Sequence, residues 1–354
     1  MSDSKKSFFE FLKSLNSVVG DLSSISAPSF LLNGNSMVEY SKYWMDYPEL
    51  ILQMNEEENE EKRMVLICKW YISTLFGSYA SRGPEKKPYN PILREKFIAN
   101  SGKCLLTSEQ VSHHPPITAF HIKCLDVEIH GHIQPTTTFK GTYVEIIPQG
   151  RVTVRIKDDI YLVSLPHLAM RGLLQVSPYF EMMDHVYIVA KSGYMADFEF
   201  ILKGYFRGEY NMFKASIYGP SENNLTTITG NWDGQSFIKQ FNEKEEVLID
   251  ILATKRTECI PVVSNDPKLS MNVWGEANAA LQVKNYSKVT ELKNKIESDQ
   301  RLLKKDNIGK NIEYKPDLFH FEEDKGTDLE ELVFKLKSFY KSNTLSNGSY
   351  VLNK

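Results

Sequence analysis

The spacing of apolar residues at the amino terminus predicts a short amphipathic helix. Apolar side chains recur there at intervals of three and four residues, the period that places them on one face of a helix. That face consists of Phe8, Phe11, Leu12 and Leu15. Ser7 and Glu10 have the spacing of a capping box at the start of the helix, and Gly20 is well placed to end it.

The middle of the chain has the pattern of β structure. From about Cys104 to Ala253, short alternating or wholly apolar runs are separated by Gly, Pro, Asn and Asp. Examples are 142–146, 152–156 and 198–202. Because no long helical pattern separates these runs, they indicate an antiparallel sheet or barrel and not a parallel sheet.

Helical periodicity appears on both sides of this region. The predicted helices are 40–50 and 63–76 before it, and 273–281, 286–306 and 328–340 after it. The expected fold class is therefore mainly β with flanking helices (α+β). We expect a single domain over 1–354, divided into an amphipathic segment (1–20), an N-terminal helical and loop segment (21–103), the β region (104–254) and a C-terminal helical subdomain (255–354).

Composition and charge exclude several classes of protein. With 42% hydrophobic and 25% charged residues, the chain has the composition of a globular protein. Its 42 Lys and Arg against 45 Asp and Glu give a net charge of −3, which argues against a nucleic-acid partner and requires a local cluster for any anionic ligand. The longest aliphatic run, Met64–Cys68, is far shorter than a membrane span, and no secretory signal is evident, so we expect a cytoplasmic protein.

Motif searches do not indicate an enzyme or a metalloprotein. The four cysteines are widely spaced, without a CxxC pair or a Cys/His cluster at zinc spacing, so we expect reduced thiols and no metal. The sequence contains no GxSxG, GxxxxGK[ST], GxGxxG or HExxH motif. We therefore expect neither catalytic residues nor a cofactor.

The densest run of candidate chemistry is EQVSHHPP at 109–116. The two prolines end a strand, and where the pleat breaks His113 and His114 can turn toward one ligand. Taken alone, the pair is most simply two solvated histidines. An anion site ranks second, and a metal site, which would need a third ligand, ranks last.

Two further segments carry cations. KKPYNPIL at 86–93 reads by itself as a proline-rich loop with solvated lysines, among them Lys87. Lys293, Glu297 and Arg301 lie four residues apart along one stripe of a helix, which by itself is an exposed ladder of ion pairs.

These three segments, in this order, resemble the oxysterol-binding protein family. EQVSHHPP is similar to the fingerprint of that family, and KKPYNPIL followed by Glu95 resembles its second signature, with Arg94 where a glycine is usual. The similarity extends from Ser7 to about Leu303 and is greatest to the short fungal members that consist of the lipid-binding domain alone.

The resemblance implies a fold and an activity. The family fold is an incomplete antiparallel β-barrel around a lipid tunnel, with an N-terminal amphipathic lid, here residues 1–20, and C-terminal helices. Its members carry lipids between membranes, and several exchange phosphatidylinositol 4-phosphate for sterol or phosphatidylserine. Transient contact with Golgi, endoplasmic reticulum or plasma membrane is therefore expected. By motif, His113, His114 and Arg301 would bind the 4-phosphate, and Lys87, Lys293 and Glu297 the inositol ring or the glycerol phosphate.

The resemblance to the family defines the second lipid less well than it defines the phosphoinositide. Trp44 and Tyr79 match residues of the sterol site in sterol-binding relatives, but Ser78 replaces a glutamine, and Ile133 and Pro148 occupy positions of amide side chains. Sterol is the first expectation for the second lipid, and phosphatidylserine or another phospholipid is the alternative. A phosphoinositide sensor without bulk transfer is the rival function, and a lipid hydrolase is the rival class.

Overall fold

The computed structural model describes residues 28–80, 87–172, 179–204, 207–221, 223–240, 242–310, 314–339 and 345–353. The predicted amphipathic helix with Phe8, Phe11, Leu12 and Leu15 lies outside the described residues.

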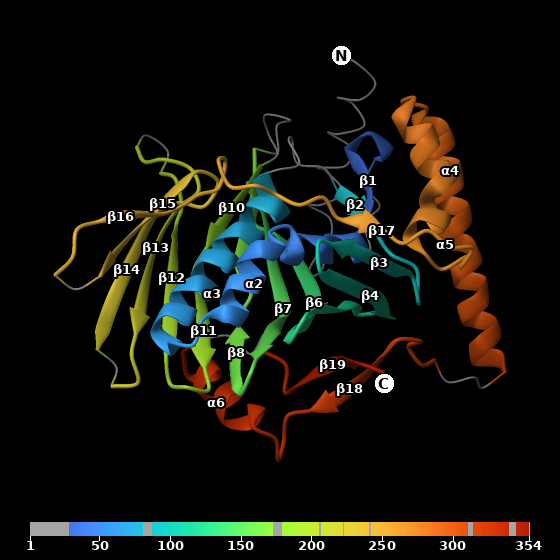
Figure 1. Ribbon diagram of the computed structural model, residues 1–354. Helices are drawn as coiled ribbons and strands as arrows, with labels where there is room; N and C mark the ends of the chain where they lie inside the picture. The colour runs from blue at the N-terminus through green and yellow to red at the C-terminus, as the bar shows by residue number, and fades with distance from the viewer. Residues whose placement is uncertain are drawn as a thin grey trace.

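A single large sheet dominates the described structure (Figure 1). Its strands are β3 (Lys96–Ser101), β4 (Cys104–His113), β5 (Pro116–Cys124), β6 (Val127–Phe139), β7 (Val144–Ile156), β8 (Asp159–Val163), β9 (His167–Arg171), β10 (Tyr179–Met183), β11 (His185–Ala190), β12 (Met195–Ile201), β13 (Met212–Tyr218), β14 (Asn224–Asn231), β15 (Gln235–Gln240), β16 (Glu246–Asp250) and β17 (Ile260–Pro261).

Neighbouring strands of this sheet are antiparallel and mostly consecutive in the chain. The order runs from β16 to β11, then β8 to β3, and ends at β17, while β9 and β10 form a branch beside β7. Because β16 and β17 are the two ends of this path, the sheet of described strands stays open. The incomplete antiparallel barrel expected from the sequence is thus confirmed. The sheet begins earlier than predicted, with β3.

Two helices pack against the sheet and fill much of the core. They are α2 (Pro48–Glu56) and α3 (Glu60–Leu75), which lie across the sheet in Figure 1. The Asn59 side chain caps α3 by accepting from the backbone N–H of Lys62, at 3.0 Å. Trp70 and Tyr71 of α3 are fully buried. The helix continues into a π-helical turn, η4 (Phe76–Ala80).

The helix predicted over 40–50 is instead two elements. A 3₁₀ helix, η3 (Met37–Met45), precedes α2, and Pro48 is the first residue of α2. Proline disfavours the helical conformation in the residue before it, and Tyr47 accordingly has φ −123° and ψ 67°. A second short 3₁₀ helix, η2 (Ser29–Leu31), leads into a small parallel sheet of β1 (Leu32–Ser36) and β2 (Lys87–Tyr89).

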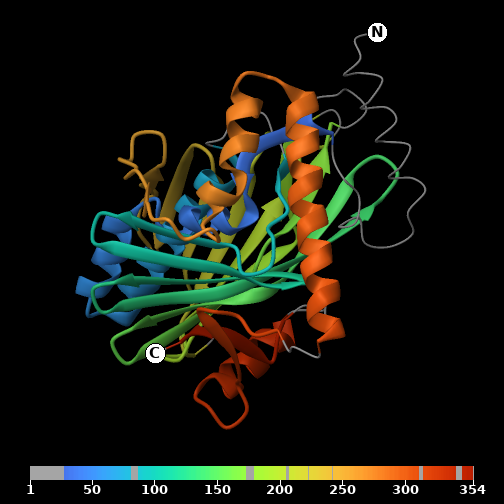
Figure 2. The same cartoon turned by 90° about the vertical axis from the view of Figure 1, so that its right-hand side faces the viewer.

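The carboxyl-terminal part contains the three predicted helices. They are α4 (Ser270–Gln282), α5 (Tyr286–Gly309) and α6 (Leu329–Phe339). Figure 2 shows α4 and α5, in orange, standing as a hairpin beside the teal strands. An antiparallel pair, β18 (Phe319–Glu323) and β19 (Gly348–Leu352), was not predicted. Each of these strands is short, and α6 separates them in the chain. The sequence on either side therefore contains no second strand pattern that would indicate a pair.

The expectation of four reduced thiols is wrong for one pair. Cys104 and Cys124 lie directly opposite each other on β4 and β5, with 4.2 Å between their Cα atoms, and form a disulfide. The spacing of 20 residues gives no sign of this pairing, because only the register of the two strands brings the cysteines together. Cys68 and Cys259 have free thiols.

Candidate functional site

The first part of the candidate site is the end of strand β4. The strand stops at His113 as predicted, and β5 begins at Pro116 after a cis His114–Pro115 peptide bond. A register shift between Gln110 and Ser112 marks a bulge just before this end. The rings of His113 and His114 meet edge to face, with 4.5 Å between centroids. The break in the strand thus presents the two imidazoles together.

The second part is strand β2, which carries Lys87. Two residues later, the ring of Tyr89 stacks on that of Trp274 in α4, with centroids 4.2 Å apart. The buried carboxylate of Glu95 accepts hydrogen bonds from the indole Nε1 of Trp274, at 3.0 Å, and from the backbone N–H of Ile92, at 2.9 Å. These contacts fix the KKPYNPIL segment against α4.

Helix α5 provides the third part. Lys293 and Glu297 form an ion pair with an Nζ–Oε1 distance of 2.9 Å, as their four-residue spacing predicts, and the Lys293 side chain is nearly buried. Arg301 lies one turn further along α5 and is exposed. The α5 cation whose charge acts on His113 is Lys304. Sequence reasoning missed Lys304, although its position three residues after Arg301 puts it on the same side of the helix.

Electrostatics connect these parts into one site. Burial, and then the charge of Lys293, lower the pKa of Lys87 to about 8, while the charge of Glu297 opposes the shift. Burial also lowers the pKa of His113, and the charges of His114 and Lys304 add to this effect against that of Glu297.

We call the residues Lys87, His113, His114, Lys293, Glu297 and Lys304 the basic cluster. Five of them are cations or groups that can become cationic, and one is a carboxylate. An anion bound among them would relieve their mutual repulsion and make charge-assisted hydrogen bonds. The arrangement therefore fits a phosphate-bearing ligand.

The residues suggested as tunnel or sterol contacts lie apart from the basic cluster in sequence and belong to the main apolar core or its margin. Trp44 is buried and stacks on Phe120, with 5.8 Å between centroids. Tyr79 is half-buried on η4 beside Ser78, and its ring contacts those of Phe180 and Trp232.

Two strand positions complete this set. Ile133 on β6 is half-buried and packs against the same core. Pro148 on β7 pairs with Pro135. The side chains of Ile133, Pro148 and Ser78 together offer one hydroxyl and no amide. Of these positions, Ile133 lies against the main apolar core.

The described residues form neither a metal site nor a membrane-spanning helix. In these parts of the chain, no three or more His, Cys, Asp or Glu side chains gather in a way that would hold a metal ion. None of the described helices combines the length and apolar character that crossing a bilayer requires.

An open antiparallel barrel with helices packed against it and a basic cluster at the end of one strand combines an apolar interior with cations that fit an anionic ligand. The chain belongs to the oxysterol-binding protein family, whose model matches residues 7–278. It is 36% identical over 319 residues to an oxysterol-binding protein homologue of Schizosaccharomyces pombe, with 85% of this chain and 80% of the relative covered. Protein KES1 of Mycosarcoma maydis is 32% identical over 356 residues, with 94% and 93% covered.

Solved structures share the fold. The ORD domain of Osh1 in complex with cholesterol superimposes with a TM-score of 0.72 at 20% identity, covering 88% of this chain and 82% of that one. The ORD of Osh3 in complex with PI(4)P, from Saccharomyces cerevisiae, gives 0.71 at 22% identity, with 88% and 86% covered.

Proposed function

We propose that this protein is a lipid-transfer protein that extracts phosphatidylinositol 4-phosphate and a second lipid and exchanges them between membranes. The observation that carries the proposal is the basic cluster, which combines Lys87, the two histidines and the α5 cations around one carboxylate. Relatives that share the fold are described in complex with PI(4)P and with sterols, which supports both ligand classes.

In this proposal the basic cluster binds the phosphorylated head group. His113 and His114 contact the 4-phosphate together with Arg301, which lies outside the cluster one turn along α5 from Glu297, and Lys304 adds to the positive potential there. Lys87 and Lys293 contact the ring or the glycerol phosphate, while Glu297 accepts hydrogen bonds from ring hydroxyls and keeps Lys293 oriented. Charge-assisted contacts of this kind contribute about 1.5 to 3 kcal/mol each.

The acyl chains or a sterol would occupy an apolar tunnel inside the barrel. Moving a sterol into water costs on the order of 15 to 20 kcal/mol, at about 0.8 kcal/mol per CH₂-sized group, so a carrier must replace the bilayer around its cargo. Tyr79 and Ile133, which lie half-buried at the margin of the core, are the proposed lining on the side of Trp44. In sterol-binding relatives, amide side chains bind the sterol hydroxyl at the positions of Ser78, Ile133 and Pro148. Because this chain lacks those amides, sterol is the weaker of the two ligands. Phosphatidylserine is the alternative second cargo.

Membrane contact would be transient and would involve the amino-terminal segment. The apolar face with Phe8, Phe11, Leu12 and Leu15 would cover the tunnel mouth in the loaded protein and contact lipid when open. This role is a prediction from the sequence.

A transfer assay between two liposome populations tests the proposal. Donor vesicles contain phosphatidylinositol 4-phosphate and acceptors contain sterol, and the lipids in each population are measured over time. Net countertransport supports the proposal. Binding without transfer would instead support a sensor, and loss of phosphate would reveal a hydrolase. Mass spectrometry of the lipids that copurify with the protein identifies the second cargo.

A further inference from the structure

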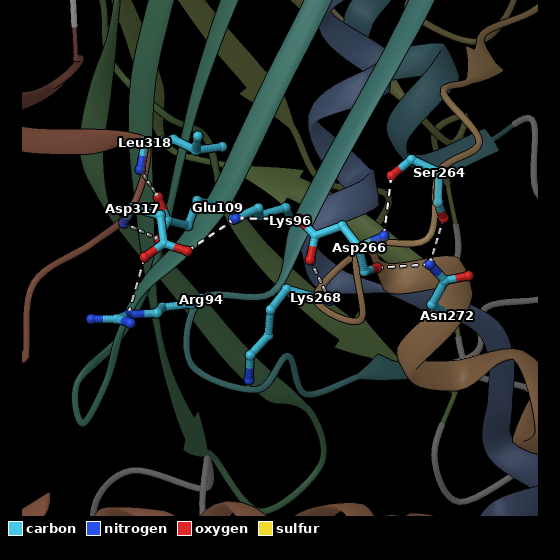
Figure 3. Close-up of polar contacts among 9 residues, drawn as sticks. All are labelled: Arg94, Lys96, Glu109, Ser264, Asp266, Lys268, Asn272, Asp317 and Leu318. Carbon is cyan, nitrogen blue, oxygen red and sulfur yellow. Dashed lines mark hydrogen bonds and ion pairs between the residues drawn. The ribbon is translucent and has the colours of Figure 1, made fainter.

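The α4–α5 hairpin carries half of the basic cluster, so its position relative to β4 sets the geometry of that site. Lys293, Glu297 and Lys304 are on α5, whereas His113 is at the end of β4. A polar network drawn in Figure 3 connects the chain on both sides of this hairpin to strands β3 and β4.

Lys96 of β3 is the centre of this network. Its Nζ lies 2.9 Å from Oδ2 of Asp317, eight residues after α5 ends, and 3.3 Å from Oδ2 of Asp266, four residues before α4 begins. Figure 3 shows the Lys96 side chain extending between the two carboxylates. Only 13% of the Lys96 side chain is exposed, so both ion pairs are partly shielded from water.

The entry into α4 is also fixed by backbone contacts. The N–H of Lys96 donates to the carbonyl of Lys268, at 2.8 Å. The side-chain amide of Asn272, in the first turn of α4, donates to the carbonyls of Ser264 and Asp266, at 2.9 and 2.7 Å. The loop before α4 therefore has little freedom to shift along β3.

Glu109 of β4 fixes the segment after α5. This residue is fully buried, and its two carboxylate oxygens accept from the backbone N–H groups of Asp317 and Leu318, at 2.8 and 2.7 Å. The side chain of Arg94 also pairs with Asp317, at 3.3 Å. Glu109 opens the EQVSHHPP run but contacts this segment, and lies four residues before His113.

We propose that Lys96 is a positioning residue, which acts together with Asp317, Asp266 and Glu109. It holds the α4–α5 hairpin at the distance from β4 at which the cations of α5 and His113 can contact the same head group. This inference rests on the proposed function for its ligand. Lys96 itself does not contact the head group in this account. It acts by tying both ends of the hairpin to the strand pair that ends at His113.

The test compares Lys96→Met with Lys96→Arg, which keeps a long cation, and with Lys123→Met, which removes an exposed lysine paired with Glu128 on the same sheet. Asp317→Asn is a milder second variant should Lys96→Met fold poorly. Three properties are measured for each protein: binding to phosphatidylcholine vesicles containing phosphatidylinositol 4-phosphate, loading of the second lipid, and hydrogen exchange of residues 286–309.

We expect Lys96→Met and Asp317→Asn to accelerate exchange in α5 and to weaken phosphoinositide binding about tenfold, while loading of the second lipid and the melting temperature change little. Lys96→Arg should restore both properties, and Lys123→Met should alter neither. Unchanged exchange in α5 would overturn the inference, and so would an equal loss of both lipids. If the wild-type protein bound no phosphoinositide, the proposed function would fail, while the exchange measurement would still decide whether Lys96 positions the hairpin.

Discussion

Lys87 shows how burial and neighbouring charge prepare a single side chain for an anion. Burial, and to a smaller extent the charge of Lys293, lower its pKa to about 8. At mildly alkaline pH, much of the free protein therefore carries Lys87 as a neutral amine. A bound phosphate favours the protonated form and raises the pKa again.

Phosphoinositide affinity should therefore depend on the proton of Lys87. We expect the affinity to change little between about pH 7 and 8 and to fall by up to about tenfold per pH unit above that range, because the ligand prefers the protonated amine. In acid, protonation of His113 and His114 adds a separate rise in affinity. Lys87→Arg, which stays protonated, should remove this dependence. Glu95, whose pKa burial raises to about 8, titrates in the same range and remains in that variant as an internal control. Identical pH profiles for the two proteins would contradict the assignment.

The backbone conformation at Arg94 is one that favours glycine, the residue that the family signature has at this position. Its φ of 64° lies in the left-handed region, which an L side chain adopts at a cost of about 1–2 kcal/mol. Its side chain offsets part of this by pairing with Asp317 and lying over the ring of Tyr314, at 5.2 Å. The arginine at this position thus adopts a left-handed backbone conformation and adds a contact to the segment after α5.

The backbone at Arg94 can be tested with two truncations. Both Arg94→Ala and Arg94→Gly remove the side-chain contacts, but only glycine also relieves the positive φ. We expect the glycine variant to be more stable than the alanine variant by about 1 kcal/mol in urea unfolding. An alanine variant of equal or greater stability would show that the left-handed conformation is not maintained.

A buried ion pair anchors the strand pair β18–β19 to the barrel, beside an apolar cluster that joins the same strands to β4 and β5. Arg151 of β7 is fully buried, and its guanidinium donates to both carboxylate oxygens of Asp324, which follows β18, with one distance of 2.7 Å. The same guanidinium donates to the carbonyl of Ser346, just before β19, at 3.0 Å. One side chain of the barrel thus holds both strands at the same end of the pair, where Glu323 lies opposite Gly348.

Removing one partner should leave an uncompensated buried charge. We expect Asp324→Ala to lower the free energy of unfolding by about 3–5 kcal/mol, whereas the Arg151→Met/Asp324→Leu double variant recovers much of the loss. Asp306→Ala, which breaks the exposed pair with Lys310, should change it by less than about 1 kcal/mol. Chemical denaturation measures all three, and a loss in Asp324→Ala no larger than in Asp306→Ala would refute the anchoring role.

The elements differ in how far the sequence predicts them. Strong local signals, such as the apolar periodicity of α3 and the prolines after His113, identified helices and a strand end correctly. Contacts that depend on strand register or on distant segments have no local signal. The Cys104–Cys124 pair and the β18–β19 pairing were missed for this reason. Lys96 likewise reads as an ordinary strand lysine until Asp266 and Asp317 are brought to it.

A lipid carrier must cover its apolar cargo during transit through water. Deleting residues 1–20 should leave a folded protein whose transfer rate falls sharply, because a loaded tunnel would stay open to water. The liposome transfer assay measures the rate, and circular dichroism checks the fold. A transfer rate equal to that of the full chain would exclude a gating role for Phe8, Phe11, Leu12 and Leu15.

In the proposed exchange mechanism, two lipids compete for one interior while only the phosphoinositide uses the basic cluster. Their binding must then be mutually exclusive, and by linkage each must weaken the other to the same extent. Replacing His113 and His114 together by alanine removes two cationic donors. This should weaken phosphoinositide binding by about a hundredfold or more and spare the loading of the second lipid.

The most direct measurement titrates protein preloaded with fluorescent sterol against liposomes containing phosphatidylinositol 4-phosphate, for the wild type and for the His113→Ala/His114→Ala variant. We expect the phosphoinositide to displace sterol from the wild type and the variant to require about a hundredfold more phosphoinositide. Simultaneous occupancy by both lipids, or displacement that is unchanged in the variant, would contradict the single-interior exchange mechanism.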